Sequence, residues 1–292
     1  MQQLSLFENT YSDRIINVAS VPQRSPFRYP GGKTWLVPRI RQWLSSLQWQ
    51  PQKFIEPFAG GGIVSLTVAF EQLANHVTMI EIDEQVAAVW QTILLGNGVE
   101  LAHKIANFDF SLSSVENILS NTNCNLEDKA FQTILKNRIN RGGILAVGAG
   151  KIKNGENGKG IKSRWYPETL KQRILNIVSI QDRITFIQGD GLDFLVKNAD
   201  ISQAVFFIDP PYTAGFKKAG SRLYNYSEID HEKLFKIASS IAGDFLMTYN
   251  DGEEIRFLAK KYGFTIATVA MKNTHHAKMT ELLISKNLDW LK

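Results

Sequence analysis

The sequence predicts an α/β fold, in which a parallel sheet is flanked by helices and interrupted by an insertion. Short apolar stretches that suit strands alternate with longer stretches that suit helices, at the spacing of a parallel sheet. The strand near Ile55 and the expected fourth strand, which ends at Asp209, lie 154 residues apart. Three βα units need only about 90 residues, so roughly 60 residues are surplus to the sheet.

The first half of the sheet is predicted from two strand–helix pairs. Residues 36–47 suit a helix that follows a Pro-Gly-Gly turn. The segment FIEPFAGGG at 54–62 suits a strand that ends in a glycine loop, and 63–73 suits the next helix. Residues 76–83 then give a second strand and 84–94 a second helix.

The strand–helix pattern returns after a long interruption. Strands are expected at 183–190, RITFIQGD, and at 203–212, QAVFFIDPPY. The remaining elements are expected as a helix near 230–242, a strand at 245–251, a helix at 253–261 and strands near 264–272 and 280–286.

The interruption predicts a second lobe. Residues 97–175 are polar, helical in places and later rich in glycine, and we expect them to form a lobe inserted into the main α/β domain. That domain then comprises residues 25–96 and 176–292. Residues 1–24 show no clear periodicity and are expected to form an N-terminal arm.

Positive charge concentrates in one part of the expected insert. The net charge is +5, but residues 136–173 contain ten basic and two acidic side chains, so the rest of the chain carries −3. A basic segment on a near-neutral body suits a polyanion such as nucleic acid, although a solvated lysine-rich loop would have the same composition. We expect the polyanion to contact Arg138, Arg141, Lys151, Lys153, Lys159, Lys162 and Arg164.

Composition excludes several classes of protein. Apolar residues make up 44% of the chain and charged residues 21%, which is typical of a globular protein. The single cysteine, Cys124, allows no intramolecular disulfide and no zinc site built on two thiolates. No apolar run approaches the ~20 residues of a membrane span, and the N-terminus lacks a signal-peptide pattern. We expect a cytoplasmic protein without membrane contact or bound metal.

The first expected strand ends in a loop that suits a nucleoside ligand. The loop runs from Glu56 through Phe58 to Gly60 and Gly62, and glycines at such a strand end let a ligand approach the backbone. Glu81 follows Gly62 by 19 residues, where an acidic side chain can accept hydrogen bonds from ribose hydroxyls. The loop is not GxGxxG, so it suits a nucleoside cofactor without phosphates better than a pyrophosphate.

A second motif, Asp209-Pro210-Pro211-Tyr212, directly follows the apolar strand FFI. Ligands of open α/β sheets bind at such strand ends. The Asp209 carboxylate and the Pro210 carbonyl can accept hydrogen bonds from an exocyclic base amine and localise its lone pair. Both prolines stiffen the loop, and the ring of Tyr212 offers a face on which an unstacked base can lie. The motif therefore indicates chemistry at a base amine.

Other features of the sequence are ambiguous or point to structure. Gly32-Lys33-Thr34 is similar to the end of a P-loop, but Phe27 stands where the first glycine is required, so we reject that interpretation. Phe131 is expected in a helix core. The sequence leaves two roles open for Trp165 and Tyr166, which are stacking on nucleic acid and packing within the insert.

The glycine loop and the DPPY motif, in this order and separated by a basic insert, resemble the Dam-type (class D12-like, alpha-group) adenine-specific DNA methyltransferases. FRYPGGK at 27–33 is similar to the N-terminal motif of that family, and Asn137-Arg138 with Gly142-Gly143 is similar to a further signature. The resemblance covers roughly residues 25–290. It implies a Rossmann-like, seven-stranded methyltransferase core with an inserted, mostly helical DNA-recognition lobe.

The resemblance also implies ligands. S-adenosyl-L-methionine would be the methyl donor, and the N6 amine of a flipped adenine in duplex DNA would be the acceptor. The region that reads Gly-Glu-Phe-Asn in many members is Gly142-Gly143-Ile144-Leu145 here, so their recognition sequence does not carry over. The expected cofactor contacts are Tyr29 and Lys33 at the methionine end, Phe58, Gly60 and Gly62 around the pocket, Glu81 at the ribose and Asp190 near the adenine, with Glu56 and Asp209 completing the set.

Three alternatives stay open. The acceptor could be the exocyclic amine of cytosine, although such enzymes often carry Ser at the first position of the tetrapeptide. It could be RNA, although no appended RNA module is visible. A non-catalytic DNA-binding protein is the third, although both motifs are intact. We expect duplex DNA as the partner, with a cognate restriction endonuclease possible, and a monomeric chain.

Overall fold

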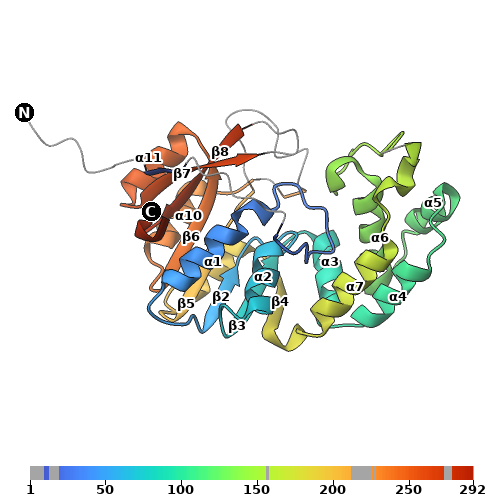
Figure 1. The fold of residues 1–292 in the computed structure, drawn as a ribbon, viewed down its shortest axis with the longest axis horizontal. Coiled ribbons are helices and arrows are strands. Elements are labelled where there is room, and N and C mark those ends of the chain that lie inside the picture. Colours follow the sequence, from blue (N-terminus) through green and yellow to red (C-terminus); the bar gives the residue numbers. More distant parts are fainter. Residues whose placement is uncertain are drawn as a thin grey trace, which may run out of the picture.

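A twisted sheet lies between two layers of helices, and a helical lobe stands beside it (Figure 1). The computed structural model describes residues 10–12, 20–155, 158–211, 225–226, 228–272 and 278–291. This arrangement confirms the α/β fold class. The helical character expected for the insert is also found.

The sheet contains the seven expected strands and one more, in the order β1-β7-β8-β6-β5-β2-β3-β4. All neighbouring strands are parallel except β8, which runs antiparallel to β6 and β7. Only residues 273–277 separate β7 from β8, too few for the crossover that a parallel pair requires. The strands are β1 (Thr10–Ser12), β2 (Lys53–Glu56), β3 (His76–Glu81), β4 (Ile184–Gln188), β5 (Ala204–Ile208), β6 (Asp244–Asn250), β7 (Thr265–Lys272) and β8 (Lys278–Ser285).

The additional strand, β1, comes from the segment expected to be an arm. Its three residues pair in parallel with 267–269 of β7 and extend the edge of the sheet. Such a short strand carries no periodicity, which explains why the sequence did not predict it.

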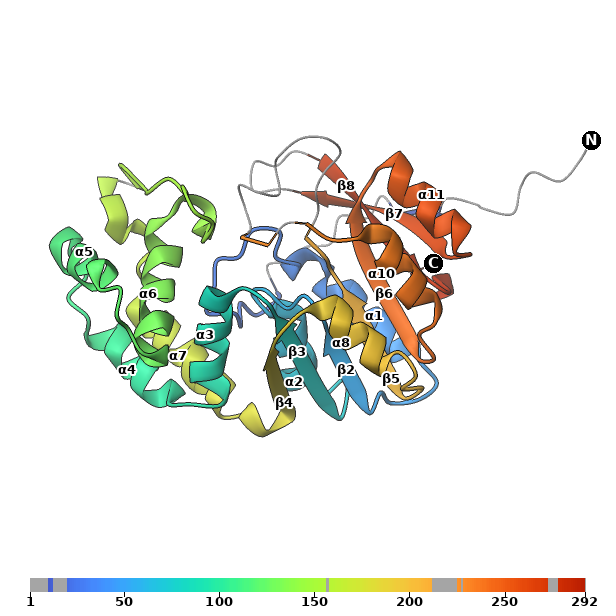
Figure 2. The same cartoon turned by 180° about the vertical axis from the view of Figure 1, so that it is seen from behind.

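Helices cover both faces of the sheet. The central strands are apolar on both faces, so Val205 and Phe207 belong to one buried cluster and Phe206 and Ile208 to the other. The first cluster lies under α1 (Val37–Ser46), α2 (Ile63–Glu71) and α3 (Glu84–Leu94). The second lies under α8 (Gly191–Asn198), α10 (His231–Ser239) and α11 (Glu253–Lys261), which Figure 2 shows from the other side.

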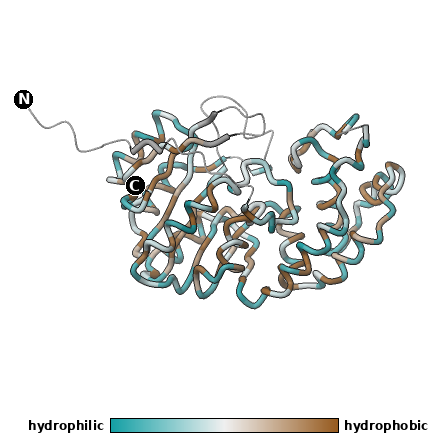
Figure 3. The backbone as a smooth tube through the Cα atoms, in the orientation of Figure 1, coloured by the Kyte–Doolittle hydropathy of each residue, from teal (hydrophilic) through white to brown (hydrophobic). Residues whose placement is uncertain are grey.

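The lobe shares a hydrophobic core with the sheet. Its Leu101, Ile134 and Ile174 belong to the same buried cluster as Trp90 and Ile93 of α3. Hydrophobic residues recur along the lobe helices as well as through the sheet (Figure 3). The lobe is therefore packed on α3 as one body with the core. Its helices are α4 (Gly98–Asn107), α5 (Leu112–Ser120), α6 (Leu126–Ile139) and α7 (Pro167–Val178), with 3-10 turns η2 (Arg141–Gly143) and η4 (Gly160–Arg164).

The domain boundaries expected from the sequence stay a prediction, because the shared core does not separate the lobe from the sheet. The expected end of the lobe at residue 175 lies inside α7, which continues to Val178. Among the described residues, no helix is long and apolar enough to cross a membrane.

The N-terminal segment, defined as residues 25–33, joins the lobe to the sheet. Asn137, at the end of α6, is fully buried and makes three hydrogen bonds. Its Oδ1 accepts from Arg28 N at 2.9 Å, and its Nδ2 donates to Arg28 O at 3.0 Å and to Gly143 O at 2.7 Å. Arg138 donates to Pro26 O, and Arg173 donates to Ser25 O at 3.1 Å.

We predict that Asn137→Ala destabilises the protein by about 2–4 kcal/mol, because it removes a fully buried side chain that makes one buried and two part-buried hydrogen bonds to the backbone. Chemical denaturation measures this loss. Asn117→Ala removes an exposed asparagine of α5 and is the matched control, expected within about 0.5 kcal/mol of wild type. Equal stability of the two variants would contradict this role of Asn137.

Candidate active site

A cleft of about 1310 Å³ lies at the carboxyl ends of the parallel strands. Its walls come from the N-terminal segment, the loop after β2, the end of β3, the residues after β5, Glu281 of β8 and the lobe turn at 142–146. This is the edge of an open α/β sheet at which ligands bind. The cleft is larger than the ~300–1,000 Å³ of a typical small-molecule pocket.

Two carboxylates from neighbouring strand ends hold the glycine loop. Glu56, the last residue of β2, accepts a hydrogen bond at 3.0 Å from Ser65 N in the first turn of α2. Glu81, the last residue of β3, accepts from Gly60 N at 2.7 Å and from Asp83 N at 2.8 Å. Burial raises the pKa of Glu56 to about 8 and that of Glu81 to about 7.

The loop glycines are required by close packing inside the protein. Gly60 and Gly62 have positive φ, which favours glycine. A Cβ on Gly60 would lie 2.5 Å from Tyr29 Cε1, and one on Gly62 would lie 2.6 Å from the Met79 methyl group. Tyr29 therefore packs over the loop, and its ring lines the cleft. The close approach that the sequence suggested for a ligand is taken, at Gly60, by a tyrosine of the N-terminal segment.

A buried lysine joins three distant parts of the chain at the cleft. Lys33 Nζ lies 3.0 Å from Asp209 Oδ1 and 3.5 Å from Glu281 Oε2, and the lysine side chain is only 4% exposed. Burial alone lowers the pKa of Lys33, but the two carboxylates outweigh it and the net shift is upward. Burial raises the pKa of Glu281 to about 7 despite Lys33. The pKa of Lys33 shifts upward because two carboxylates face its ammonium, whereas that of Glu281 shifts upward because burial outweighs the ammonium it shares with Asp209.

Asp209 is held in a fixed orientation. Its Oδ1 contacts Lys33 and also accepts a hydrogen bond from Thr248 Oγ1 of β6 at 2.7 Å. Pro210 is buried and Pro211 is half-buried, and both line the cleft. Tyr212, expected to stack on the base, lies outside the described residues.

The other expected cofactor contacts also reach the cleft. Phe58 is half-buried and lines it. Asp190 is the N-cap of α8, where its Oδ1 accepts from Leu192 N at 2.7 Å and Asp193 N at 3.0 Å. A Cβ on Gly191 would lie 2.3 Å from Pro57 O, so α8 begins directly against the glycine loop.

The basic residues expected on the polyanion divide into three groups. Arg138 is only 4% exposed and donates to the Pro26 carbonyl, so its position differs from the surface contact that was expected. Arg164 is half-buried and lines the cleft. The remaining five are exposed on the lobe, and they are Arg141, Lys151, Lys153, Lys159 and Lys162.

Aromatic residues of the lobe have separate roles. Phe131 is buried, as expected for a helix core. Trp165 stacks on Phe110 with ring centroids 4.3 Å apart, which assigns it to packing inside the lobe. Tyr166, by contrast, is 55% exposed and lines the cleft.

Sequence reasoning missed Glu281, Thr248 and the clamp made by Asn137. Glu281 stands inside the strand TELLIS, where one acidic residue in an apolar run was the only available signal.

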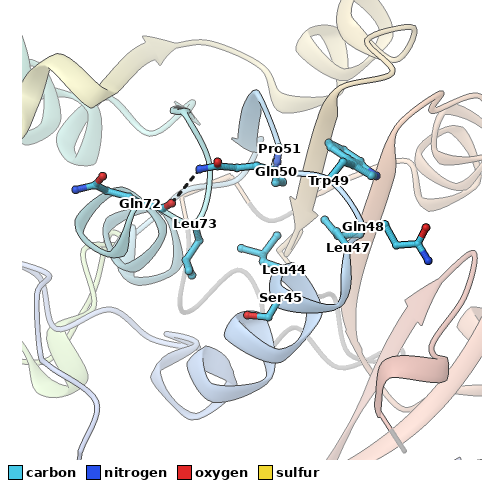
Figure 4. A pocket seen from close by; sticks show the side chains of 9 residues that line it. All are labelled: Leu44, Ser45, Leu47, Gln48, Trp49, Gln50, Pro51, Gln72 and Leu73. Atoms are coloured by element: carbon cyan, nitrogen blue, oxygen red, sulfur yellow. Dashed lines mark hydrogen bonds between the residues drawn. The ribbon is translucent and has the colours of Figure 1, made fainter.

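A second, shallow pocket lies at the opposite end of the strands, between the end of α1 and the end of α2 (Figure 4). Leucine, glutamine, tryptophan, serine and proline line it, and it contains no charged side chain. In the part of the chain that the structure describes, no group of three or more His, Cys, Asp or Glu side chains could hold a metal ion.

The strand order, the acidic strand end beside a glycine loop, and the aspartate and prolines after β5 define the class of Rossmann-like S-adenosylmethionine-dependent methyltransferases. A model of the D12 class N6 adenine-specific DNA methyltransferase family matches residues 29–274. The chain belongs to this family, which confirms the resemblance found in its motifs. It is therefore an S-adenosylmethionine-dependent adenine methyltransferase.

Comparison with other proteins adds little to this assignment. No curated protein matches the chain. A candidate RNA methyltransferase from Pyrococcus horikoshii is 11% identical, with a TM-score of 0.41 over 89% of this chain and 84% of that chain. The rRNA methyltransferase AviRa from Streptomyces viridochromogenes is 12% identical, with a TM-score of 0.37 over 88% and 86%. Similarity at this level carries no inference about the substrate.

We predict that Glu56→Gln flattens the pH dependence of stability. A pKa raised to about 8 from 4.5 means that the folded state binds the proton more tightly than the unfolded state. The stabilisation that protonated Glu56 contributes to the folded wild type is therefore fully present below pH 4.5. It is lost as the pH rises through 8. The loss is below about 5 kcal/mol, since one pKa unit corresponds to ~1.4 kcal/mol.

Unfolding free energies at pH 5, 7 and 9 measure this effect, with exposed Glu253→Gln as the control. The unfolding free energy of wild type should fall relative to that of Glu56→Gln between the lowest and the highest of these pH values. A constant difference across the range would mean that Glu56 is ionised at all three.

Proposed function

We propose that this chain methylates the N6 amine of an adenine flipped out of duplex DNA at a specific site. The observation that carries the proposal is the placement of Asp209. Its carboxylate is fixed by Lys33 and Thr248 at the strand ends and lines the same cleft as Arg164 and Arg173 of the lobe. The acceptor group and these arginines therefore face one space.

The sheet side of the cleft suits S-adenosylmethionine, which when bound supplies an electrophilic methyl group. This side of the cleft is acidic, because Glu56, Glu81, Asp209 and Glu281 all line it. Lys33 lies among these carboxyl groups. A carboxylate oxygen has two lone pairs, so Glu81 can hold the loop and still accept from a ribose hydroxyl. Tyr29, Phe58, Asp190 and the loop at Gly60 and Gly62 would complete the site.

The chain's own groups prepare the acceptor amine. Asp209 and the Pro210 carbonyl accept the two N–H groups, which localises the lone pair on nitrogen. Because buried contacts already orient Asp209, no reorganisation is needed when the base arrives. The proton lost after transfer goes to Asp209 or to water. Most of the catalytic effect is thus positioning.

The lobe suits the DNA backbone. The segment 139–152 folds back on itself, with Ile152 N donating to Ile139 O at 2.8 Å and Arg141 N donating to Gly150 O at 2.8 Å. Arg141 and Lys151 stand beside a tip where Val147 is 97% exposed. In such an arrangement the cations can contact phosphates while the apolar side chain enters the base stack. This suits a protein that unstacks a base. Stacking on Tyr212 would hold the base once it is flipped.

We predict that Asp209→Ala lowers the methylation rate by about 100- to 1000-fold or more while cofactor binding remains measurable. The fold is expected to survive, because Lys33 keeps Glu281 as a partner. The assay incubates labelled S-adenosylmethionine with unmethylated duplex DNA and identifies the methylated nucleoside by mass. Exposed Asp193→Ala is the control.

Methylated adenine from wild type and from the control, but not from Asp209→Ala, is the expected result. Methylated cytosine would correct the acceptor base. Absence of label in DNA, with intact cofactor binding, would redirect the proposal to RNA or to a binding protein. A near-normal rate in Asp209→Ala would refute the mechanism.

We further predict that changing Lys151, Lys153, Lys159 and Lys162 to Gln flattens the salt dependence of DNA binding. Four phosphate contacts contribute a slope of up to about −3.6 in log K against log salt. Fluorescence anisotropy at several salt concentrations measures the slope. Changing the exposed Lys197, Lys233, Lys236 and Lys260, which lie on α8, α10 and α11, alters the net charge equally and is the control. Equal slopes in the two variants would exclude the lobe lysines from phosphate contact.

A further inference from the structure

Glu281 occupies an unusual position for a carboxylate. It lies on β8, inside the sheet, where it pairs with Asn250 at the end of β6 and with Val269 of β7. The residue is 6% exposed, yet it lines the cleft. Placing a charged group in such a strand costs several kcal/mol unless a partner or a ligand compensates.

The partner of Glu281 compensates only in part. Lys33 Nζ is 3.5 Å from Glu281 Oε2, but it is closer, at 3.0 Å, to Asp209 Oδ1 and also donates to Gly31 O at 3.1 Å. Oε2 of Glu281 is buried and accepts no hydrogen bond from the described residues. Burial raises the pKa of Glu281 to about 7, so above this pH both carboxylates are ionised, and one ammonium between them leaves the triad with a formal charge of −1.

A structural ion pair would need only one of the two carboxylates. Asp209 already neutralises Lys33 and is the acidic member of the motif after β5. The second carboxylate therefore adds a negative charge that no further ion pair among the described residues balances, at the wall of a cleft whose proposed ligand carries a sulfonium cation.

We propose that Glu281 is a positioning residue that holds Lys33 jointly with Asp209 and makes the cleft wall selective for a cationic ligand over its neutral product. This inference rests on the proposed cofactor site and deepens it. S-adenosylmethionine carries a positive sulfur, whereas S-adenosylhomocysteine carries a neutral thioether in its place. Selectivity for the cation favours binding of the donor and release of the product.

The test compares two unreactive ligands by calorimetry, without DNA, at a pH about one unit above the raised pKa of Glu281, where its carboxylate is ionised. Sinefungin carries an ammonium where the donor has its sulfonium, and S-adenosylhomocysteine is neutral there. The proposal requires wild type to bind sinefungin more tightly. Glu281→Gln should reduce the preference for sinefungin, taken as the ratio of the two dissociation constants, by about three- to tenfold, as expected for a partly screened charge interaction. Glu281→Asp keeps the charge and should retain most of the ratio.

Exposed Glu253→Gln is the control and should leave the ratio unchanged. A folded Glu281→Gln protein whose ratio stays within twofold of wild type would overturn the proposal. If this variant does not fold, wild type decides alone, because an equal or reversed preference between the two ligands overturns it. Neither ligand measurement involves DNA, so a failure to methylate DNA would count against the proposed function and leave this result standing.

Discussion

One buried ammonium group fixes the geometry of the cleft. Lys33 stands in the N-terminal segment, yet it contacts Asp209 after β5 and Glu281 on β8. The other end of the same segment is held by Asn137 and Arg173 of the lobe. The segment is thus tied to the sheet at one end and to the lobe at the other. The width of the cleft follows from these two attachments.

The charges of the cleft are separated. Carboxylates gather at the strand ends because each of β2, β3 and β5 ends in, or is followed by, an acidic residue, and parallel strands bring these ends to one edge. Arginines come from the N-terminal segment and the lobe, and they are Arg28, Arg138, Arg164 and Arg173. The cleft therefore offers acidic groups to the proposed cationic donor and basic groups to the proposed nucleic acid.

The sequence was sufficient to predict the strands of the sheet. It was insufficient to predict the side-chain contacts that join distant parts of the chain at the strand ends. Strands such as FFI and the loop after Ile55 have a local signal, because burial on both faces requires a continuous apolar run. Lys33 and Glu281 are 248 residues apart, and no local pattern relates them. The burial of Arg138 was not predicted for a related reason, since a basic window states the charge of a residue but not its burial. Gly60 was recognised as a place of close approach, but only the fold identifies Tyr29 as the group that approaches.

The insertion point of the lobe bears on the proposed function, in which a helical body presents DNA to a site on the sheet. Asp83, two residues after Glu81, caps the start of α3, and the lobe packs on that same helix through one continuous core. The orientation of the lobe is therefore set by a helix whose first turn lies at the proposed ribose contact. A hinge between separate cores would leave the distance from the proposed phosphate contacts to Asp209 variable. Shared packing instead fixes this distance before substrate binds, which is the condition that a mechanism based on positioning requires.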